Sequence, residues 1–177
     1  MRKITSGILV SLCLLLSAFT VLQNINYQVR NGFIVSFKNS ELSGSFSKLK
    51  GNIAFNENHL EQSVFDMIVE VSSIKTGNFL KNMHAKGSDW FDADHYPNIR
   101  FISGNFEKKG SNYIVTGTLE LHGVKKQVGI PFTFTNNVFA GDFTINRLEF
   151  KVGDMKGMSA KVPADLHISL FVPVIEK

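Results

Sequence analysis

Apolar side chains alternate with polar ones through most of this chain, and that period of two constrains the fold more than any other feature. The clearest run spans residues 65–71, FDMIVEV, in which Asp66 and Glu70 separate apolar neighbours. Because successive side chains of a strand point to opposite faces of a sheet, such a run predicts a half-buried strand. Related runs occupy residues 27–37, 49–55, 99–103, 113–121, 124–134, 139–145 and 166–174. The pattern predicts an all-β domain of about eight strands.

One long segment without alternation, residues 73–98, interrupts the strand pattern. Asn78 is a suitable N-cap, and good helix formers follow it as far as Lys86. Phe79 and Met83 are four residues apart and would share one face of such a helix. We therefore predict a short helix here that closes one end of the fold.

Two architectures agree with this set of strands. A barrel closed on itself has no free sheet edge, while two packed sheets would give the same alternation. The apolar faces include many of the 16 Phe of the chain, and on their own they favour a packed core in either architecture. Pro131 lacks an N–H group, so we expect it at a bulge or at a sheet edge.

The N-terminus has the pattern of a secretory signal. A basic start, MRK, precedes an apolar run that ends before Gln23. We predict a signal peptide at residues 1–22, cut near Thr20, and one domain at residues 23–177. An uncleaved membrane anchor is the alternative, because the run approaches the length that spans a bilayer. Cys13, the only cysteine, lies in this run, so the remaining domain must rest on its own core without a disulfide.

The charge balance gives no indication of a nucleic-acid partner. Arg2 and Lys3 belong to the signal segment, and removing them from the 19 basic residues leaves 17, against 15 acidic ones. The longest purely basic clusters are the pairs at 108–109 and 125–126. A nucleic-acid footprint would need a concentrated basic stripe.

The sequence offers little that could carry chemistry. The five histidines are far apart, and no pair has the spacing of metal ligands on a helix. Asp92, Asp94 and His95 form the nearest cluster, but Asp in a turn usually caps the local backbone. Neither a nucleophile motif nor a nucleotide-binding loop occurs. We expect no metal, no cofactor and no catalysis, with a hydrolase that uses this Asp/His loop as the weaker alternative.

Four groups of residues, in order along the chain, carry a resemblance to a known family. The central group comprises SSIKTGN at residues 72–78, His84, DWFDADHYP at 89–97 and IRFISG at 99–104. The other groups lie at residues 44–56, 115–126 and 143–153, and the last of them contains FTINR and a Val-Gly pair. Together they resemble the YceI-like family.

The resemblance implies an exported protein of the bacterial periplasm that holds a polyisoprenoid lipid. It favours an antiparallel eight-stranded lipocalin-like β-barrel with one short helix closing an end, and a hollow interior. We expect an elongated apolar ligand, of the isoprenoid type, to be lined by Phe33, Val35, Phe55, Val69, Phe101, Leu119, Phe132 and Phe143. A structural or stress-response barrel with a filled core is the alternative.

The loop after the predicted helix is expected to plug one barrel end. Trp90 and Phe91 are large enough to exclude water there, and Asp92 and Asp94 can hold the loop by accepting backbone N–H bonds. His84 matches the family's histidine after the helix. We expect His84 to be structural and to donate a ring N–H to a carbonyl or carboxylate.

Charged residues near the predicted helix could contact a lipid headgroup. Lys81, Lys86 and Arg100 could meet an anionic group, although such charges usually belong to plain surface. The expected partners are therefore an apolar lipid and, briefly, a membrane, but no nucleic acid. The sequence predicts no particular oligomeric state.

Overall fold

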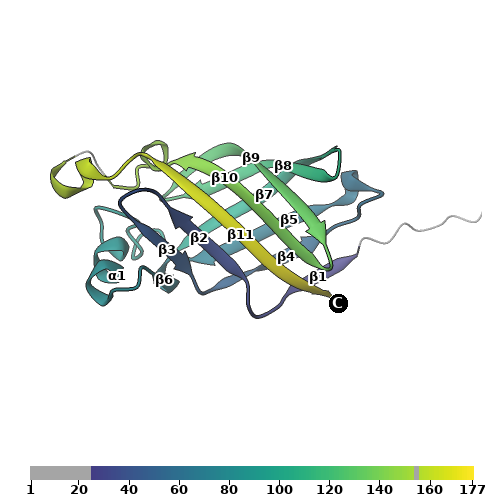
Figure 1. The fold of residues 1–177 in the computed structure, drawn as a ribbon, viewed down its shortest axis with the longest axis horizontal. Helices are drawn as coiled ribbons and strands as arrows, with labels where there is room; N and C mark the ends of the chain where they lie inside the picture. The colour runs from purple at the N-terminus through teal and green to yellow at the C-terminus, as the bar shows by residue number, and fades with distance from the viewer. Residues whose placement is uncertain (1–24, 154–155) are drawn as a thin grey trace, which may run out of the picture.

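The computed structural model describes residues 25–153 and 156–177 as one antiparallel sheet that curls into a closed barrel (Figure 1). Its strands are β1 (Asn26–Val29), β2 (Ile34–Lys38), β3 (Ser43–Phe46), β4 (Leu49–Ala54), β5 (Val64–Glu70), β6 (Ile74–Lys75), β7 (Asn98–Lys109), β8 (Asn112–Leu121), β9 (Val124–Thr135), β10 (Val138–Asn146) and β11 (Asp165–Glu176). The helices among the described residues are α1 (Phe79–Lys86) and the short 3-10 helices η1 (Leu60–Gln62), η2 (Val71–Ser73), η3 (Arg147–Phe150) and η4 (Gly157–Lys161).

The barrel closes where β1 pairs with β11, because β10 is bonded to the other edge of β11. Strands β1 and β2 both lie along β11 and form one strand with a bend at Gly32, whose φ of 91° suits glycine. In the same way β4 and β3 continue each other, as do β5 and β6. With each bent strand counted once, the barrel has eight strands, which confirms the predicted fold and excludes two separate sheets.

Two tight turns bring long neighbouring strands into register. The β8–β9 hairpin turns at His122 and Gly123, and the β9–β10 hairpin turns at Asn136 and Asn137. All four residues have positive φ, between 51° and 71°, as a two-residue hairpin turn that follows the twist of its strands requires. Asn and Gly adopt this conformation at little cost, so the sequence predicts both turns locally.

Helix α1 begins where the sequence predicts it. The side-chain oxygen of Asn78 accepts hydrogen bonds from the N–H groups of Leu80 and Lys81, at 2.9 and 3.2 Å. A second amide oxygen, that of Asn82, accepts from both the N–H and the hydroxyl of Thr76, at 2.7 and 2.8 Å. The helix is thus capped and tied to the end of β6 by its own polar side chains.

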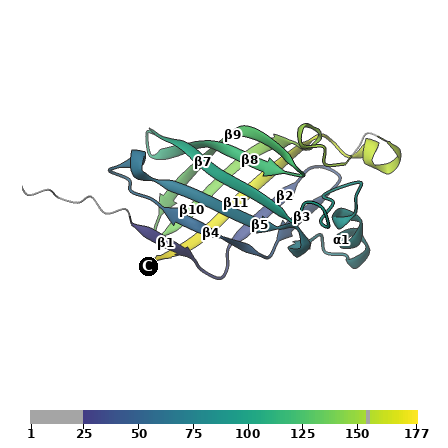
Figure 2. The ribbon, with the colours of Figure 1, turned by 180° about the vertical axis from the view of Figure 1, so that it is seen from behind.

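The barrel is elongated, and its two ends differ (Figures 1 and 2). Helix α1, β3, β6 and η4 lie at one end, here called the helical end, whereas β1 and the C-terminus lie at the other, the terminal end. In the part of the chain that is described, no helix is long and apolar enough to cross a bilayer. The predicted signal peptide at residues 1–22 lies outside the described residues.

One seam of the barrel wall has few backbone pairs. Strands β9 and β10 pair at three positions next to their turn, whereas β8–β9 and β10–β11 each pair at nine. Pro131 lies just beyond the last pair, inside β9 rather than in an edge strand. Its carbonyl faces Gly141 of β10, where an added Cβ would come within 2.5 Å of the oxygen. The missing N–H of Pro131 therefore falls on the side where the ladder has stopped.

Candidate ligand cavity

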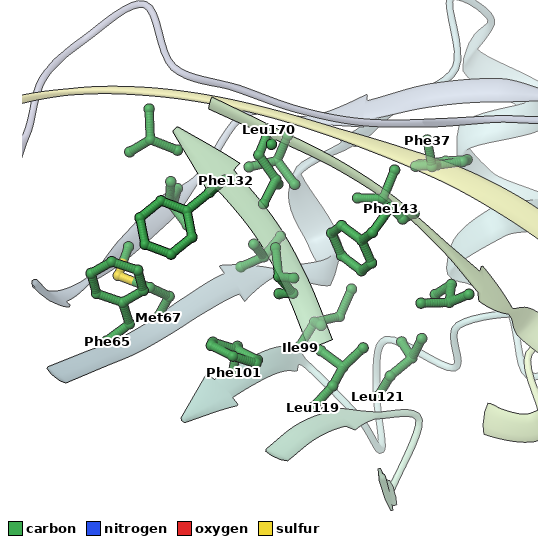
Figure 3. A pocket seen from close by; sticks show the side chains of 18 of the residues that line it. Phe37, Phe65, Met67, Ile99, Phe101, Leu119, Leu121, Phe132, Phe143 and Leu170 are labelled. Carbon is green, nitrogen blue, oxygen red and sulfur yellow. The ribbon is translucent and has the colours of Figure 1, made fainter. Parts of the chain in front are cut away.

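The barrel encloses a cavity of about 190 Å3 whose wall is apolar except for one residue. A single water needs about 10–15 Å3 of such space, so the cavity is more than ten times larger than one buried water requires. Figure 3 shows its side chains converging from several strands. The wall consists of Val35, Phe37, Leu49, Ile53, Phe65, Met67, Val69, Phe91, Ile99, Phe101, Val115, Leu119, Leu121, Ile130, Phe132, Phe139, Ala140, Gly141, Phe143, Ile145, Arg147, Val152, Leu166, Ile168, Leu170 and Val172.

At the terminal end the cavity stops against a cluster of eight aromatic rings, here called the aromatic floor. Phe55 lies at its centre, 1% exposed, with six other rings at centroid distances of 5.2 to 6.2 Å. Neighbouring rings meet mostly edge to face, a favoured geometry for aromatic pairs. The floor comprises Tyr27, Phe55, Phe65, Phe106, Tyr113, Phe132, Phe134 and Phe139.

Towards the helical end the cavity stops against a smaller cluster, here called the aromatic cover. It consists of Phe37 of β2, Phe46 of β3 and Phe91, which comes from the loop after α1. Their ring centroids are 5.6 to 6.2 Å apart. The backbone N–H of Phe91 donates to the carbonyl of Ala85 at 3.1 Å, so this ring is attached to the last turn of α1.

Six of the eight residues predicted to line a ligand lie on the cavity wall: Val35, Val69, Phe101, Leu119, Phe132 and Phe143. The other two lie elsewhere. Phe55 faces inward, as its alternation predicts, but the space in front of it is filled by the aromatic floor. Phe33 precedes β2 at the bend of the first strand and is only partly buried against the core.

The loop residues hold the helical end differently from the prediction. Phe91 is buried and lines the cavity, whereas Trp90 packs against Arg147 beside it. The Asp92 carboxylate does not cap backbone N–H groups; it pairs with His95 Nδ1 at 2.9 Å. This hydrogen bond raises the pKa of His95. The loop is instead pinned by the carbonyl of Asp92, which accepts from the N–H of Tyr96 at 2.8 Å.

The expected role of His84 is wrong. Its side chain is exposed on α1 and makes no hydrogen bond with the described residues. His84 lies on the side of α1 that faces solvent, whereas Asn82 and Ala85 lie on the packed side. The His84 carbonyl accepts from the N–H of Gly87 at 3.0 Å at the end of the helix.

Arg147 is the polar residue of the cavity wall, and its structural importance was not predicted from the sequence. It is fully buried, and its guanidinium donates to four backbone carbonyls at 2.7 to 3.1 Å, those of Val152, Ser159, Val162 and Pro163. A buried charge is tolerated only with such hydrogen bonds. The guanidinium also lies 5.3 Å from the Trp90 ring centroid.

A local signal for Arg147 exists in the sequence. Phe143, Ile145 and Arg147 share one parity, so an arginine continues the inward face of β10 at its end. Gly153 supports the arrangement in two ways. Its φ of 69° suits glycine, and its backbone lies so close to the guanidinium that an added Cβ would be 2.6 Å from Arg147 Nη1. An inward arginine followed by such a glycine indicates a buried guanidinium.

The charged residues expected near a headgroup belong to two different elements. Arg100 is on β7 and donates to Asp66 at 2.7 and 2.8 Å, which lowers the pKa of that carboxyl. Lys81 and Lys86 belong to α1 at the helical end. Across residues 25–153 and 156–177, no three His, Cys, Asp or Glu side chains gather as metal ligands would.

Closure into one antiparallel barrel around an apolar cavity defines the class of the protein: a lipocalin-like barrel with room for an internal ligand. A model of the YceI-like domain matches residues 22–171. The chain therefore belongs to the YceI-like family.

Relatives and solved structures agree with this assignment. A UPF0312 protein of Vibrio parahaemolyticus is 30% identical over 149 residues, covering 76% of this chain and 79% of that protein. Another, of Photorhabdus laumondii, is 32% identical over 89 residues, which span 50% of this chain and 46% of that protein. BcnA of Burkholderia cenocepacia superimposes with a TM-score of 0.74 at 29% identity, over 81% of this chain and 96% of BcnA.

A more distant structure shares the fold. It is a polyisoprenoid binding domain from Saccharophagus degradans, implicated in plant cell wall breakdown. It superimposes with a TM-score of 0.63 over 86% of this chain and 99% of that domain, at 11% identity. At this level of identity the likeness concerns the barrel alone.

Proposed function

We propose that this protein binds an elongated apolar ligand, an isoprenoid-type lipid, non-covalently inside the barrel. The observation that carries the proposal is the cavity, whose wall offers no polar group except Arg147. The Arg147 guanidinium is turned towards backbone carbonyls. An apolar cavity of this kind is poorly hydrated and favours an apolar occupant.

The position of the cavity supports a chain-shaped ligand. Its wall reaches from Phe65 and Phe132 of the aromatic floor to Phe37 and Phe91 of the aromatic cover, and in Figure 3 Phe65 and Phe37 lie at opposite sides of the lined space. Burial of a prenyl chain would contribute roughly 25 cal/mol per Å2 before ordering costs. The Saccharophagus domain named as polyisoprenoid binding has the same fold, which agrees with this ligand class.

The proposed site of action is the bacterial periplasm, and the proposed role is to carry or store lipid rather than to catalyse a reaction. The basic start and apolar run of residues 1–22 support export with removal of a signal peptide near Thr20. Intact-mass measurement of the exported protein tests this step. Recovery of the full N-terminus in a membrane fraction would favour the anchor instead.

Native mass spectrometry of protein isolated from a bacterial envelope is the direct test of the ligand. We expect a bound apolar species that organic solvent releases and whose fragmentation shows repeating isoprene units. A released species with unbranched acyl chains would retain lipid binding but overturn the isoprenoid assignment. Protein that is entirely ligand-free after gentle isolation would favour a structural barrel.

A pair of variants locates the ligand. Leu119→Phe combined with Leu170→Phe adds ring volume to the cavity wall, where both side chains point into the space (Figure 3). We expect this variant to fold, because the added rings enter empty space, and to lose the co-purifying lipid. The matched control is Ile34→Phe, which adds a ring at a side chain 49% exposed outside the barrel. Equal lipid retention in both variants would place the ligand outside the cavity.

A further inference from the structure

Helix α1 exposes a concentration of large apolar side chains at the helical end. Phe79, Leu80 and Met83 are 79%, 59% and 54% exposed. They lie within five consecutive positions of one eight-residue helix. Removing such side chains from water is favourable. A cluster of them on an exposed helix therefore indicates a surface that contacts a partner.

The three side chains form one face of the helix. At about 100° per residue they fall within a single arc, and Asn82 and Ala85 lie outside that arc, towards the barrel. The helix does not need this face in order to form, because Asn78 caps it and Asn82 holds it to Thr76. The apolar face is therefore free to contact something other than this barrel.

Basic groups border the same face. Lys86 lies at one edge of the arc, and His84 followed by Lys81 lies at the other. No acidic residue occurs between Glu70 and Asp89, so the charged side chains of α1 are all basic. Asp89 and Asp94 follow in the loop and are exposed. Of the acidic residues that follow, Asp92 is paired with His95. An apolar face bordered by lysines matches an interface of acyl chains and anionic headgroups.

The helix is also bonded directly to the aromatic cover. The N–H of Phe91 donates to the Ala85 carbonyl at 3.1 Å, and the N–H of Ala93 donates to the Lys86 carbonyl at 2.9 Å. Phe91 itself lines the cavity. Any surface that binds α1 would therefore also keep the aromatic cover of the barrel close to that surface.

We propose that α1 is a membrane-docking helix, which lays Phe79, Leu80 and Met83 into the surface of a bilayer that contains anionic phospholipid. Docking brings the helical end of the cavity to the layer in which an apolar lipid resides. The transfer of lipid between the bilayer and the cavity rests on the proposed function, but docking itself does not require the cavity to be occupied.

Vesicle flotation with the protein isolated from the periplasm tests the proposal. The probe is phosphatidylcholine with about one quarter phosphatidylglycerol, compared with phosphatidylcholine alone. We expect Phe79→Ser, Leu80→Ser and Met83→Ser together to lower the bound fraction at least tenfold. We expect Lys81→Gln and Lys86→Gln to lower binding about fivefold each, on anionic vesicles only.

The matched control removes apolar area from the barrel wall. Ile34 and Phe171 lie opposite each other on β2 and β11, and both are exposed, at 49% and 43%. Ile34→Ser with Phe171→Ser should float like the parent protein. Equal losses in the control and the helix variant, equal binding to both vesicle types, or self-association through α1 without vesicle binding would each overturn the proposal.

A second measurement covers the case in which residues 1–22 are retained and anchor the protein. A nitroxide spin label is attached at Leu80→Cys in a variant that also carries Cys13→Ser. Adding vesicles should shield this label from a water-soluble paramagnetic relaxation agent. A label at Ile34→Cys should stay accessible to the agent. A label at position 80 that stays in water would overturn the proposal. The cavity variant with Leu119→Phe and Leu170→Phe should still dock, and the helix variant should still carry lipid, so the two proposals can fail separately.

Discussion

The two ends of the cavity are both closed by aromatic rings, but the rings are held in different ways. In the aromatic floor, seven of eight rings belong to strands and the eighth, Phe55, directly follows β4. In the aromatic cover, Phe37 and Phe46 belong to strands, whereas Phe91 comes from a loop attached to α1. The backbone that carries the floor belongs to the barrel wall, whereas one of the three rings of the cover is carried by a loop.

This difference indicates the direction in which a ligand enters and leaves. The backbone of a paired strand is displaced only if ladder hydrogen bonds break, whereas the backbone at Phe91 belongs to a loop and can move with the segment around α1. We therefore expect the floor to matter most for the stability of the barrel and the cover for access to its interior. Four predictions test this division, in order of decreasing effect.

The largest effect is expected for Phe55→Ala in the aromatic floor. Loss of a buried phenyl ring with six aromatic neighbours should lower the free energy of unfolding by about 3–5 kcal/mol. Denaturant melts measure it. The control is Phe79→Ala on α1, where a side chain 79% exposed should change stability by less than about 0.5 kcal/mol. Similar losses for both variants would contradict the special position of the floor.

Arg147→Met should come next, because it leaves buried carbonyls without their donor. We expect a loss of about 1–3 kcal/mol in the free energy of unfolding. Amide hydrogen exchange should locate the loosening at η3 and η4, with the strands around Phe55 unchanged. If protection fell equally at both ends, the two ends would not be independent.

Phe91→Ala should change ligand exchange, an effect that neither of the first two variants is expected to share. Removing the loop ring opens the cover, and we expect release of a bound lipid to accelerate about tenfold, equivalent to about 1.4 kcal/mol on the barrier. Stopped-flow transfer of lipid to acceptor vesicles measures the rate. Phe134→Ala in the floor, at a ring that does not line the cavity, is the matched control and should leave the rate unchanged. Faster release from that variant would place the exit at the terminal end.

The smallest effect is expected from pH. The hydrogen bond to Asp92 raises the pKa of His95. The stabilisation of the loop by this pair is therefore complete at a pH below the ordinary histidine pKa of about 6.5. It is lost as the pH rises through the raised pKa. Lipid release should therefore quicken slightly from pH 5 to pH 8, by less than in Phe91→Ala. Asp92→Asn should remove this pH dependence, and its persistence in that variant would assign it to another group.

Local sequence patterns predicted the parts of this structure that depend on neighbouring residues. Alternation located the strands, Asn78 located the start of α1, and the pairs at 122–123 and 136–137 located the turns. Each of these is decided within a few residues along the chain. The closed barrel itself required the family resemblance, because two packed sheets show the same alternation.

The less successful predictions depended on contacts between distant segments. Phe55 alternates correctly, but rings from five other strands fill the space before it. His84 is exposed because Asn82 and Ala85 form the packed side of α1, which the helix pattern alone did not determine. The volume of the cavity likewise depends on side chains from most of the strands, so it cannot be predicted from any single segment.

The distribution of aromatic types gives the molecule a built-in optical reporter. Trp90 is the single tryptophan of the chain, and it lies at the helical end with the Arg147 guanidinium over its ring. Tyr27 and Tyr113 lie at the opposite end, in the floor. Indole can be excited selectively, so the emission of unlabelled protein reports the surroundings of the cover alone. We expect a lipid that displaces the cover to change this emission, so that its arrival and departure can be followed in the native sequence.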